Sequence, residues 1–114
     1  MKNLFFYLIL LCFIYPDDFK NVKVLDIKTR SEMKKYMKQI SKELGVKCSH
    51  CHDMDDPSID TIEKEITREM ILLTKNLNKT FNSDSLEYEN FTNYISCWTC
   101  HRGNVKPEYS KPNN

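Results

Sequence analysis

Two copies of the pattern C-x-x-C-H, at residues 48–52 and 97–101, constrain this chain more than any other feature. The pattern is typical of covalent haem attachment. Two thiols three residues apart lie on one helical turn, where they can add to the two vinyl groups of one porphyrin, and the next residue presents an imidazole to the iron. The sequence therefore predicts two haem c groups. Each receives two thiols and one imidazole: Cys48, Cys51 and His52 for the first haem, and Cys97, Cys100 and His101 for the second.

Paired C-x-x-C motifs also supply four thiolates to zinc in structural or interaction modules. Here the two pairs are 45 residues apart, whereas a compact zinc ribbon separates them by about 15–20. Zinc also does not require a histidine after each second cysteine. A dithiol redox motif would lie in a βαβ context, and this chain has two glycines and no strand alternation. Haem is therefore the favoured interpretation, and zinc is the main alternative.

Length and charge narrow the class of protein. With 114 residues the chain makes one small domain, in the size range where a core of side chains alone gives modest stability. Two haems would add large apolar surfaces for the chain to wrap. Lysine and arginine total 17 against 16 aspartates and glutamates, so no basic field indicates a nucleic acid. We therefore expect redox partner proteins and no nucleic acid as partners.

Residues 1–15 have the features of a secretory signal. Lys2 precedes an apolar run over residues 4–15, which is too short to span a bilayer as a helix. Cys12 resembles a lipoprotein acceptor cysteine, although Leu11 is bulky where a small residue is expected. We expect an exported, periplasmic protein, with Cys12 as a candidate position for a lipid anchor to a membrane. Without Cys12, the remaining four cysteines all lie in the two motifs.

A helix is predicted between Thr29 and Gly45, after a polar N-terminal segment at residues 16–28. Thr29 and Glu32 have the spacing of a capping box, and Gly45 stands in the usual position after a helix. Apolar residues recur between them at helical spacing: Met33, Met37, Ile40 and Leu44. Because the first motif follows directly, we expect this stripe to face the porphyrin.

A second helix is predicted after the turn-forming residues 53–57. Asp60 and Glu63 would cap it, and it would end near Asn78 or Lys79. A weaker helical pattern covers residues 84–94, and residues 106–114 are expected to form a flexible tail. The stripe of the second helix that we expect to be buried is apolar throughout: Ile62, Ile66, Met70, Leu73 and Leu77.

Together these elements predict an all-α fold. A Met-bearing helix, a turn and a C-x-x-C-H segment occur twice in the same order, so the chain consists of two tandem units. We place a small helical dihaem cytochrome c domain at residues 29–105, between the polar segment and the tail.

The sixth ligand of each iron is the remaining question. Haem coordinated by His and Met is the arrangement of electron-transfer cytochromes, because the thioether favours reduced iron. A Met on a helical stripe is more often core filler than a ligand. The unassigned His50 lies inside a motif and points away from its own iron. The candidates outside the signal are therefore Met33, Met37, Met54 and Met70.

The segments at residues 44–52, 66–70, 77–78 and 96–103 resemble the cytochrome c subunit of photosynthetic reaction centres. The resemblance covers about residues 29 to 105. It implies that Met70 ligates the second haem, and that Met37 fits the position of the first haem's ligand better than Met33, one turn away on the same side. That subunit is a much longer tetrahaem protein, so this chain corresponds to one dihaem half. A shared fold does not transfer the reaction-centre partner.

The sequence therefore predicts an exported dihaem cytochrome c that carries single electrons through two His/Met haems, with no catalytic residues. One enzymatic alternative is a haem peroxidase, in which one iron keeps an open ligand position. The chain is short for that activity and shows no catalytic distal group.

Overall fold

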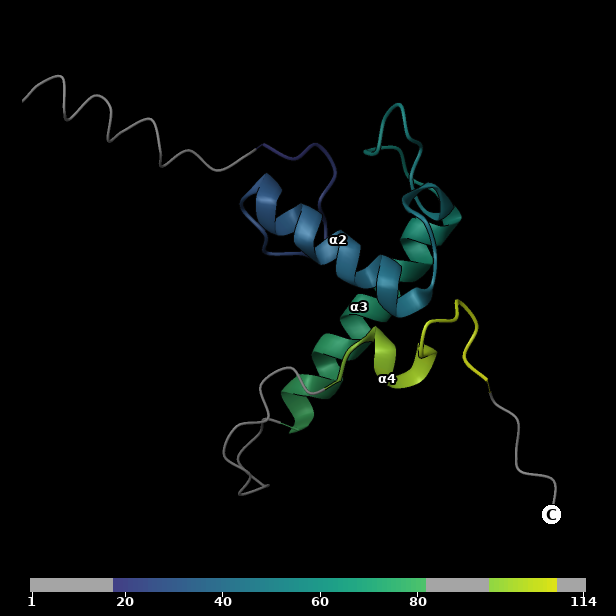
Figure 1. Cartoon of the computed structure of the whole chain (residues 1–114). Helices are drawn as coiled ribbons and strands as arrows, with labels where there is room; N and C mark the ends of the chain where they lie inside the picture. Colours follow the sequence, from purple (N-terminus) through teal and green to yellow (C-terminus); the bar gives the residue numbers. More distant parts are fainter. Residues whose placement is uncertain (1–17, 82–94, 109–114) are drawn as a thin grey trace, which may run out of the picture.

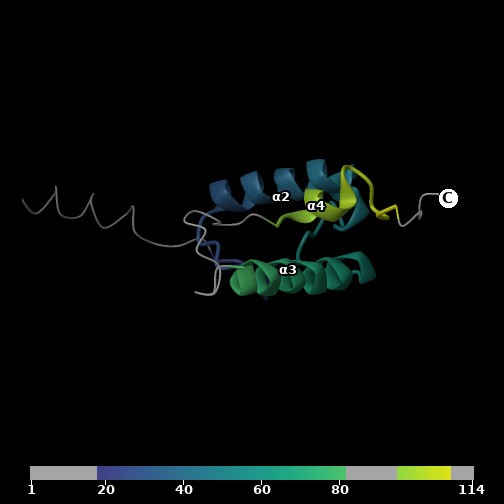
Figure 2. The same cartoon turned by 90° about the horizontal axis from the view of Figure 1, so that it is seen from below.

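The computed structural model describes residues 18–81 and 95–108. It contains helices α2 (Arg30–Leu44), α3 (Ile62–Phe81) and α4 (Cys97–His101), and a 3-10 turn, η1 (Cys48–His50). No strand occurs in the described ranges, and the predicted all-α fold is confirmed. Figure 1 shows α2 crossing α3, and Figure 2 shows α4 beside α2, with α3 as a second layer below them. The predicted signal and the predicted helix at 84–94 lie outside the described residues, as do the last six residues of the tail.

Helix α2 begins and ends where its local sequence predicts. The Thr29 hydroxyl accepts a hydrogen bond from the Glu32 backbone N–H at 3.3 Å and donates to the Glu32 carboxylate at 3.0 Å. Gly45 ends the helix with a φ of 66°, the left-handed conformation that glycine adopts without a steric penalty. Inside these limits Ile40 is buried, and Met33 and Met37 are half-buried on the same side.

The N-terminal cap of helix α3 lies one residue later than predicted, and the helix begins at Ile62. The Thr61 hydroxyl accepts from the Lys64 backbone N–H at 3.2 Å and donates to the Cys51 carbonyl at 2.8 Å, so Thr61 caps the helix and ties it to the first motif. The prediction that Asp60 is the cap is therefore wrong. Asp60 instead accepts from Lys23 Nζ at 3.0 Å. The helix continues to Phe81, beyond its predicted end.

Contrary to the prediction, the described part of the protein does not bury the expected stripe of α3. The buried residues of the helix are Arg68 and Ile71, on a face that Thr67 and Thr74 continue. Contacts with the segment before α2 favour this face, because Arg68 lies 3.4 Å from the Asn21 carbonyl and pairs with Asp60, which Lys23 also binds. The predicted stripe forms an exposed row instead, with exposed fractions of 76, 56, 40, 49 and 37% for Ile62, Ile66, Met70, Leu73 and Leu77.

The ends of α2 and α4 meet through the only two glycines of the sequence. The Gly103 backbone N–H donates to the Glu43 carbonyl at 2.9 Å, and the Trp98 N–H donates to the Glu43 carboxylate at 3.1 Å. A Cβ atom on Gly45 would overlap the carbonyl oxygen of Gly103. The two main chains can therefore approach this closely only because Gly45 has no side chain.

Replacing Gly45 with Ala should destabilise the fold strongly. The positive φ costs an L-residue about 1–2 kcal/mol, and relieving the overlap with a main-chain carbonyl adds about 1–3 kcal/mol. Chemical denaturation measures this loss. Gly103→Ala is the matched control, because its φ of 83° imposes a similar strain while its Cβ would lie 3.5 Å from the Trp98 ring, an ordinary contact. An equal loss of stability in the two variants would contradict the close approach of the Gly45 and Gly103 main chains.

Candidate functional site

The first motif forms a single turn, as predicted. The Cys51 and His52 backbone N–H groups both donate to the Cys48 carbonyl, at 3.3 and 3.0 Å. Cys48 is exposed, and Cys51 is half-buried with its Sγ 4.0 Å from the Thr67 hydroxyl on α3. Burial raises the pKa of the Cys51 thiol, a shift that the Thr67 hydroxyl partly offsets. The turn therefore presents two thiols and an imidazole within five residues.

The His52 ring is oriented by a main-chain carbonyl. Its Nδ1 lies 3.1 Å from the Pro57 carbonyl oxygen, and because a carbonyl only accepts, we assign the ring proton to Nδ1. The Nε2 lone pair is then free for a metal. The same carbonyl accepts from Lys64 Nζ at 3.0 Å, and the Lys64 side chain is only 10% exposed. Lys64 thus holds in place the acceptor that orients His52, as outer partners of ligating histidines do.

An open cavity of about 590 Å³ adjoins the first motif. Its volume lies within the range of about 300–1,000 Å³ for ligand pockets. Its lining includes the three motif residues together with Met33, Met37 and Met54. Both α2 methionines are therefore close to the first site, and the structure does not choose between them. Aliphatic side chains also line this cavity. They come from the segment before α2, from α2, from the link between α2 and η1, and from α3: Val22, Val24, Leu25, Ile40, Val46 and Ile71.

The second motif is a short capped helix. The Ser96 hydroxyl accepts from the Trp98 N–H at 3.2 Å, and the Thr99 hydroxyl accepts from the Ser96 N–H at 3.1 Å. The helix ends at His101 and is followed by Arg102, whose φ of 49° is left-handed. Cys100 is exposed and Cys97 is half-buried, and burial raises the pKa of the Cys97 thiol, helped by the nearby Glu43 carboxylate.

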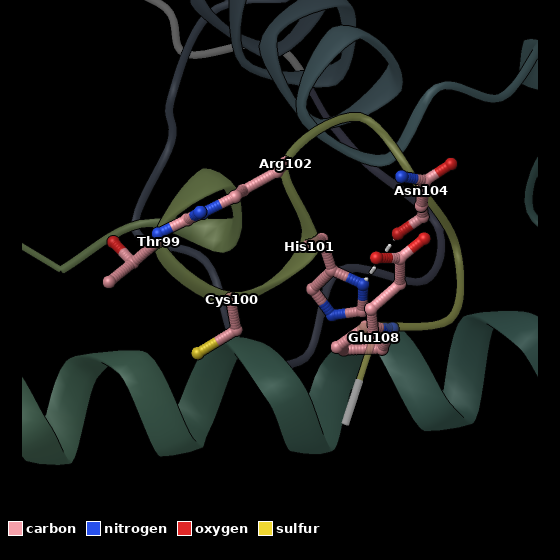
Figure 3. A pocket seen from close by; sticks show the side chains of 7 residues that line it. Thr99, Cys100, His101, Arg102, Asn104 and Glu108 are labelled. Atoms are coloured by element: carbon pink, nitrogen blue, oxygen red, sulfur yellow. Dashed lines mark hydrogen bonds between the residues drawn. The ribbon is translucent and has the colours of Figure 1, made fainter. Parts of the chain in front are cut away.

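His101 repeats the arrangement of His52. Its Nδ1 lies 2.9 Å from the Asn104 carbonyl oxygen, so the same argument leaves Nε2 free for a metal. Figure 3 shows the Cys100 sulfur and the His101 ring on one side of α4, both pointing toward α3. A cavity of about 550 Å³ adjoins them. It is lined by Arg102 and Glu108 as well as by the two motif residues.

These donor sets fit haem c better than zinc. Each site has a thiol pair on one turn and an imidazole with a free Nε2, which are the groups that a covalent haem uses. Residues 18–81 and 95–108 include all four motif cysteines, and no three His, Cys, Asp or Glu residues in these ranges are gathered to hold a metal ion. The four thiols are therefore not arranged as in a zinc ribbon.

Met70 lies on α3. It belongs to the exposed row of that helix and lines neither cavity. Its proposed bond to the second iron thus stays a prediction. His50 is exposed on η1, as expected for a histidine that points away from its own site.

Sequence reasoning missed three residues that position the motifs. The Asn78 side chain on α3 forms two hydrogen bonds with the main chain of Ile95. It donates to the carbonyl and accepts from the N–H, both at 2.8 Å. Glu43 binds α4 from α2, and Thr61 binds the first motif from the start of α3. A mid-helix asparagine is a poor helix former, and this was the one signal that could have singled out Asn78.

Comparison with known proteins supports this reading of the motifs. The family model described as the photosynthetic reaction centre cytochrome C subunit matches residues 15–113.

The chain belongs to this family.

Cytochrome c-554 of Chloroflexus aurantiacus is 33% identical over 89 residues, an alignment that covers 76% of this chain and 21% of that relative. The chain thus spans about a fifth of the length of the curated relative. No solved structure matches the chain. Membership of this family places the chain among the c-type cytochromes, whose C-x-x-C-H motifs bind haem c covalently. Among the described residues of this chain, no helix is long and apolar enough to cross a membrane.

Replacing Asn78 with Ala should loosen the attachment of the second motif. Two hydrogen bonds are lost, each with a net contribution of about 0.5–1.5 kcal/mol, so we expect the free energy of unfolding to fall by about 1–3 kcal/mol. Chemical denaturation measures the change. Asn76→Ala is the control, since Asn76 is an exposed residue of the same helix. An equal fall at Asn76 would show that the contacts to Ile95 are not responsible.

Proposed function

We propose that this chain is an exported dihaem cytochrome c that carries single electrons and catalyses no reaction of its own. One haem c is attached at Cys48 and Cys51, and the other at Cys97 and Cys100. The observation that carries the proposal is the repeated geometry of the two motifs. Each presents a thiol pair on one turn, followed by an imidazole whose Nδ1 is bound to a carbonyl three or five residues further on.

The iron ligands in this proposal are His52 and Met37 for the first haem, and His101 and Met70 for the second. When bound, each haem supplies a one-electron iron couple, which a thioether ligand shifts toward the reduced state. The chain's own residues hold and orient that group. Lys64 and the Pro57 carbonyl position the His52 ring. The lining of the first cavity, which includes Met33 and Met37, supports a methionine as the distal ligand there.

Location and partners follow from the sequence. Residues 1–15 support export, and Cys12 is the position at which a lipid would attach the protein to a membrane. The partners are redox proteins that deliver and accept single electrons. Because the chain spans about a fifth of its curated relative, a reaction centre is not proposed as the partner.

Haem content tests the proposal directly. The exported protein should contain two haems per chain when it is dissolved in alkaline pyridine and its spectrum is measured. A variant with both Cys97 and Cys100 replaced by Ala should keep one haem, because the first motif is complete without them. One haem in the unaltered chain would refute the dihaem proposal, and a colourless protein that contains zinc would end the cytochrome proposal.

Methionine ligation is tested by the methionine-to-iron charge-transfer band of the oxidised protein. Met70→Ala should remove the contribution of the second haem to this band and lower its reduction potential, while both haems stay attached. Leu73→Ala, in the same exposed row of α3, is the control and should leave the band intact.

The same band decides between the two methionines of α2. Met37→Ala should abolish the contribution of the first haem, and Met33→Ala should not. The reverse result would assign Met33. A band that neither replacement changes, together with rapid peroxide turnover, would indicate an open iron site and favour the peroxidase alternative.

A further inference from the structure

Residues 18–28, here called the N-terminal strap, form one wall of the first cavity. The strap contains no helix and lies along α3, and its Val22, Val24 and Leu25 side chains line the cavity beside Cys48 and Cys51. The sequence suggested only a polar lead-in at this position. The structure instead places three aliphatic side chains of the strap in the lining of this cavity, together with the cysteines of the first motif.

Hydrogen bonds from the strap to distant residues hold this wall in place. Asn21 Nδ2 donates to the Ser58 carbonyl and to the Asp60 carboxylate, both at 2.7 Å. Further along the strap, the Val24 carbonyl accepts from Lys75 Nζ at 2.6 Å. The strap is therefore tied at two points, to the turn before α3 and to the body of that helix.

Asp60 is the centre of the first attachment. Its carboxylate accepts from Lys23 on the strap at 3.0 Å and from the Arg68 guanidinium at 2.8 Å, in addition to Asn21. Hydrogen bonds from Lys23, then Arg68 and Asn21, hold the pKa of Asp60 far below its ordinary value. The carboxylate is thus charged throughout the neutral and mildly acidic range. We refer to Asp60, Lys23, Arg68 and Asn21 as the Asp60 clamp.

Arg68 connects the clamp to the cavity itself. Its side chain lines the cavity, is 8% exposed as a residue, and also pairs with Glu65. Its NH2 group lies 3.4 Å from the Asn21 carbonyl of the strap. A buried guanidinium with two carboxylate partners is costly to separate from either of them. Opening the strap would break the contact between Arg68 and the Asn21 carbonyl and the ion pairs of Lys23 with Asp60 and Glu65, so the charges favour the closed wall.

We propose that the Asp60 clamp holds the N-terminal strap as the wall of the first haem site and thereby raises the reduction potential of that haem. The inference rests on the proposed function. Oxidised iron carries one more positive charge than reduced iron, so a wall that replaces water with aliphatic side chains favours the reduced state. Asp60 and Arg68 are in this sense positioning residues, which act on the potential through the strap.

Asp60→Asn distinguishes the wall from a simple effect of charge, because the two effects have opposite signs. Removing a negative charge near a haem stabilises reduced iron and raises its potential. Releasing the strap admits water and lowers it. We expect a redox titration of the intact dihaem protein to show a lower potential for the first haem and an unchanged second haem. Met70→Ala, which shifts only the second haem, assigns the two potentials.

Asp55→Asn is the matched control. It removes the same charge from an exposed turn next to the first motif, where Asp55 takes no part in the clamp. In Asp55→Asn the reduction potential of the first haem should stay constant or rise. Limited trypsin digestion gives a second readout, since cleavage after Lys20 and Lys23 should be faster in Asp60→Asn than in Asp55→Asn. A constant or raised first-haem potential in Asp60→Asn, or unchanged cleavage, would overturn the proposal.

Leu25→Ser keeps the inference testable if Asp60→Asn does not fold. This variant leaves the clamp intact and places a hydroxyl in the wall, so the first-haem potential should fall, and an unchanged potential would refute the role of the wall. Failure of the proposed function is recognised separately. It would appear in the unaltered chain, as a missing haem or a missing methionine band, before any strap variant is measured.

Discussion

The contact between Gly45 and Gly103 is the constraint on which the arrangement of the two motifs depends. One glycine lies three residues before Cys48 and the other two residues after His101. Their main chains touch where a Cβ on Gly45 would not fit. The Glu43 carboxylate accepts from the Trp98 N–H of α4, and its carbonyl accepts from the Gly103 N–H. The two sites are therefore joined by backbone rather than by interchangeable side chains. Their mutual position has little freedom to vary while this contact is kept.

Helix α3 complements this junction, because it supplies contacts to both motifs. Near its start, Thr61 binds the Cys51 carbonyl, and Thr67 approaches the Cys51 thiol. Near its end, Asn78 holds the main chain that enters α4. One helix thus braces the first motif with its first turns and the second motif with its last turns. This division explains why polar residues occupy the inner face of α3, and why its aliphatic row lies elsewhere.

Sequence predicted best what depends on neighbouring residues. The limits of α2 follow from Thr29, Glu32 and Gly45, and the turns of both motifs follow from their cysteine spacing. The errors arose where distant residues decide. Asp60 and Thr61 are both residue types that cap helices well. Asp60 binds Lys23, which is distant in the sequence, and Thr61 caps the helix instead. Helical periodicity likewise marks an apolar row on α3 without showing which face is covered. The strap has no periodicity to detect, and Met33 and Met37 share one face, so spacing could not separate them.

The carbonyl acceptors of His52 and His101 have a broader consequence. Each histidine is oriented by a main-chain oxygen a few residues downstream, at Pro57 or at Asn104, and not by a side chain from another part of the fold. A segment of about ten residues therefore contains the thiols, the imidazole and the main-chain carbonyl that orients the imidazole. The orientation of each histidine is therefore encoded locally, within the segment that carries it. Duplication of such a segment would copy each motif histidine together with its own carbonyl acceptor.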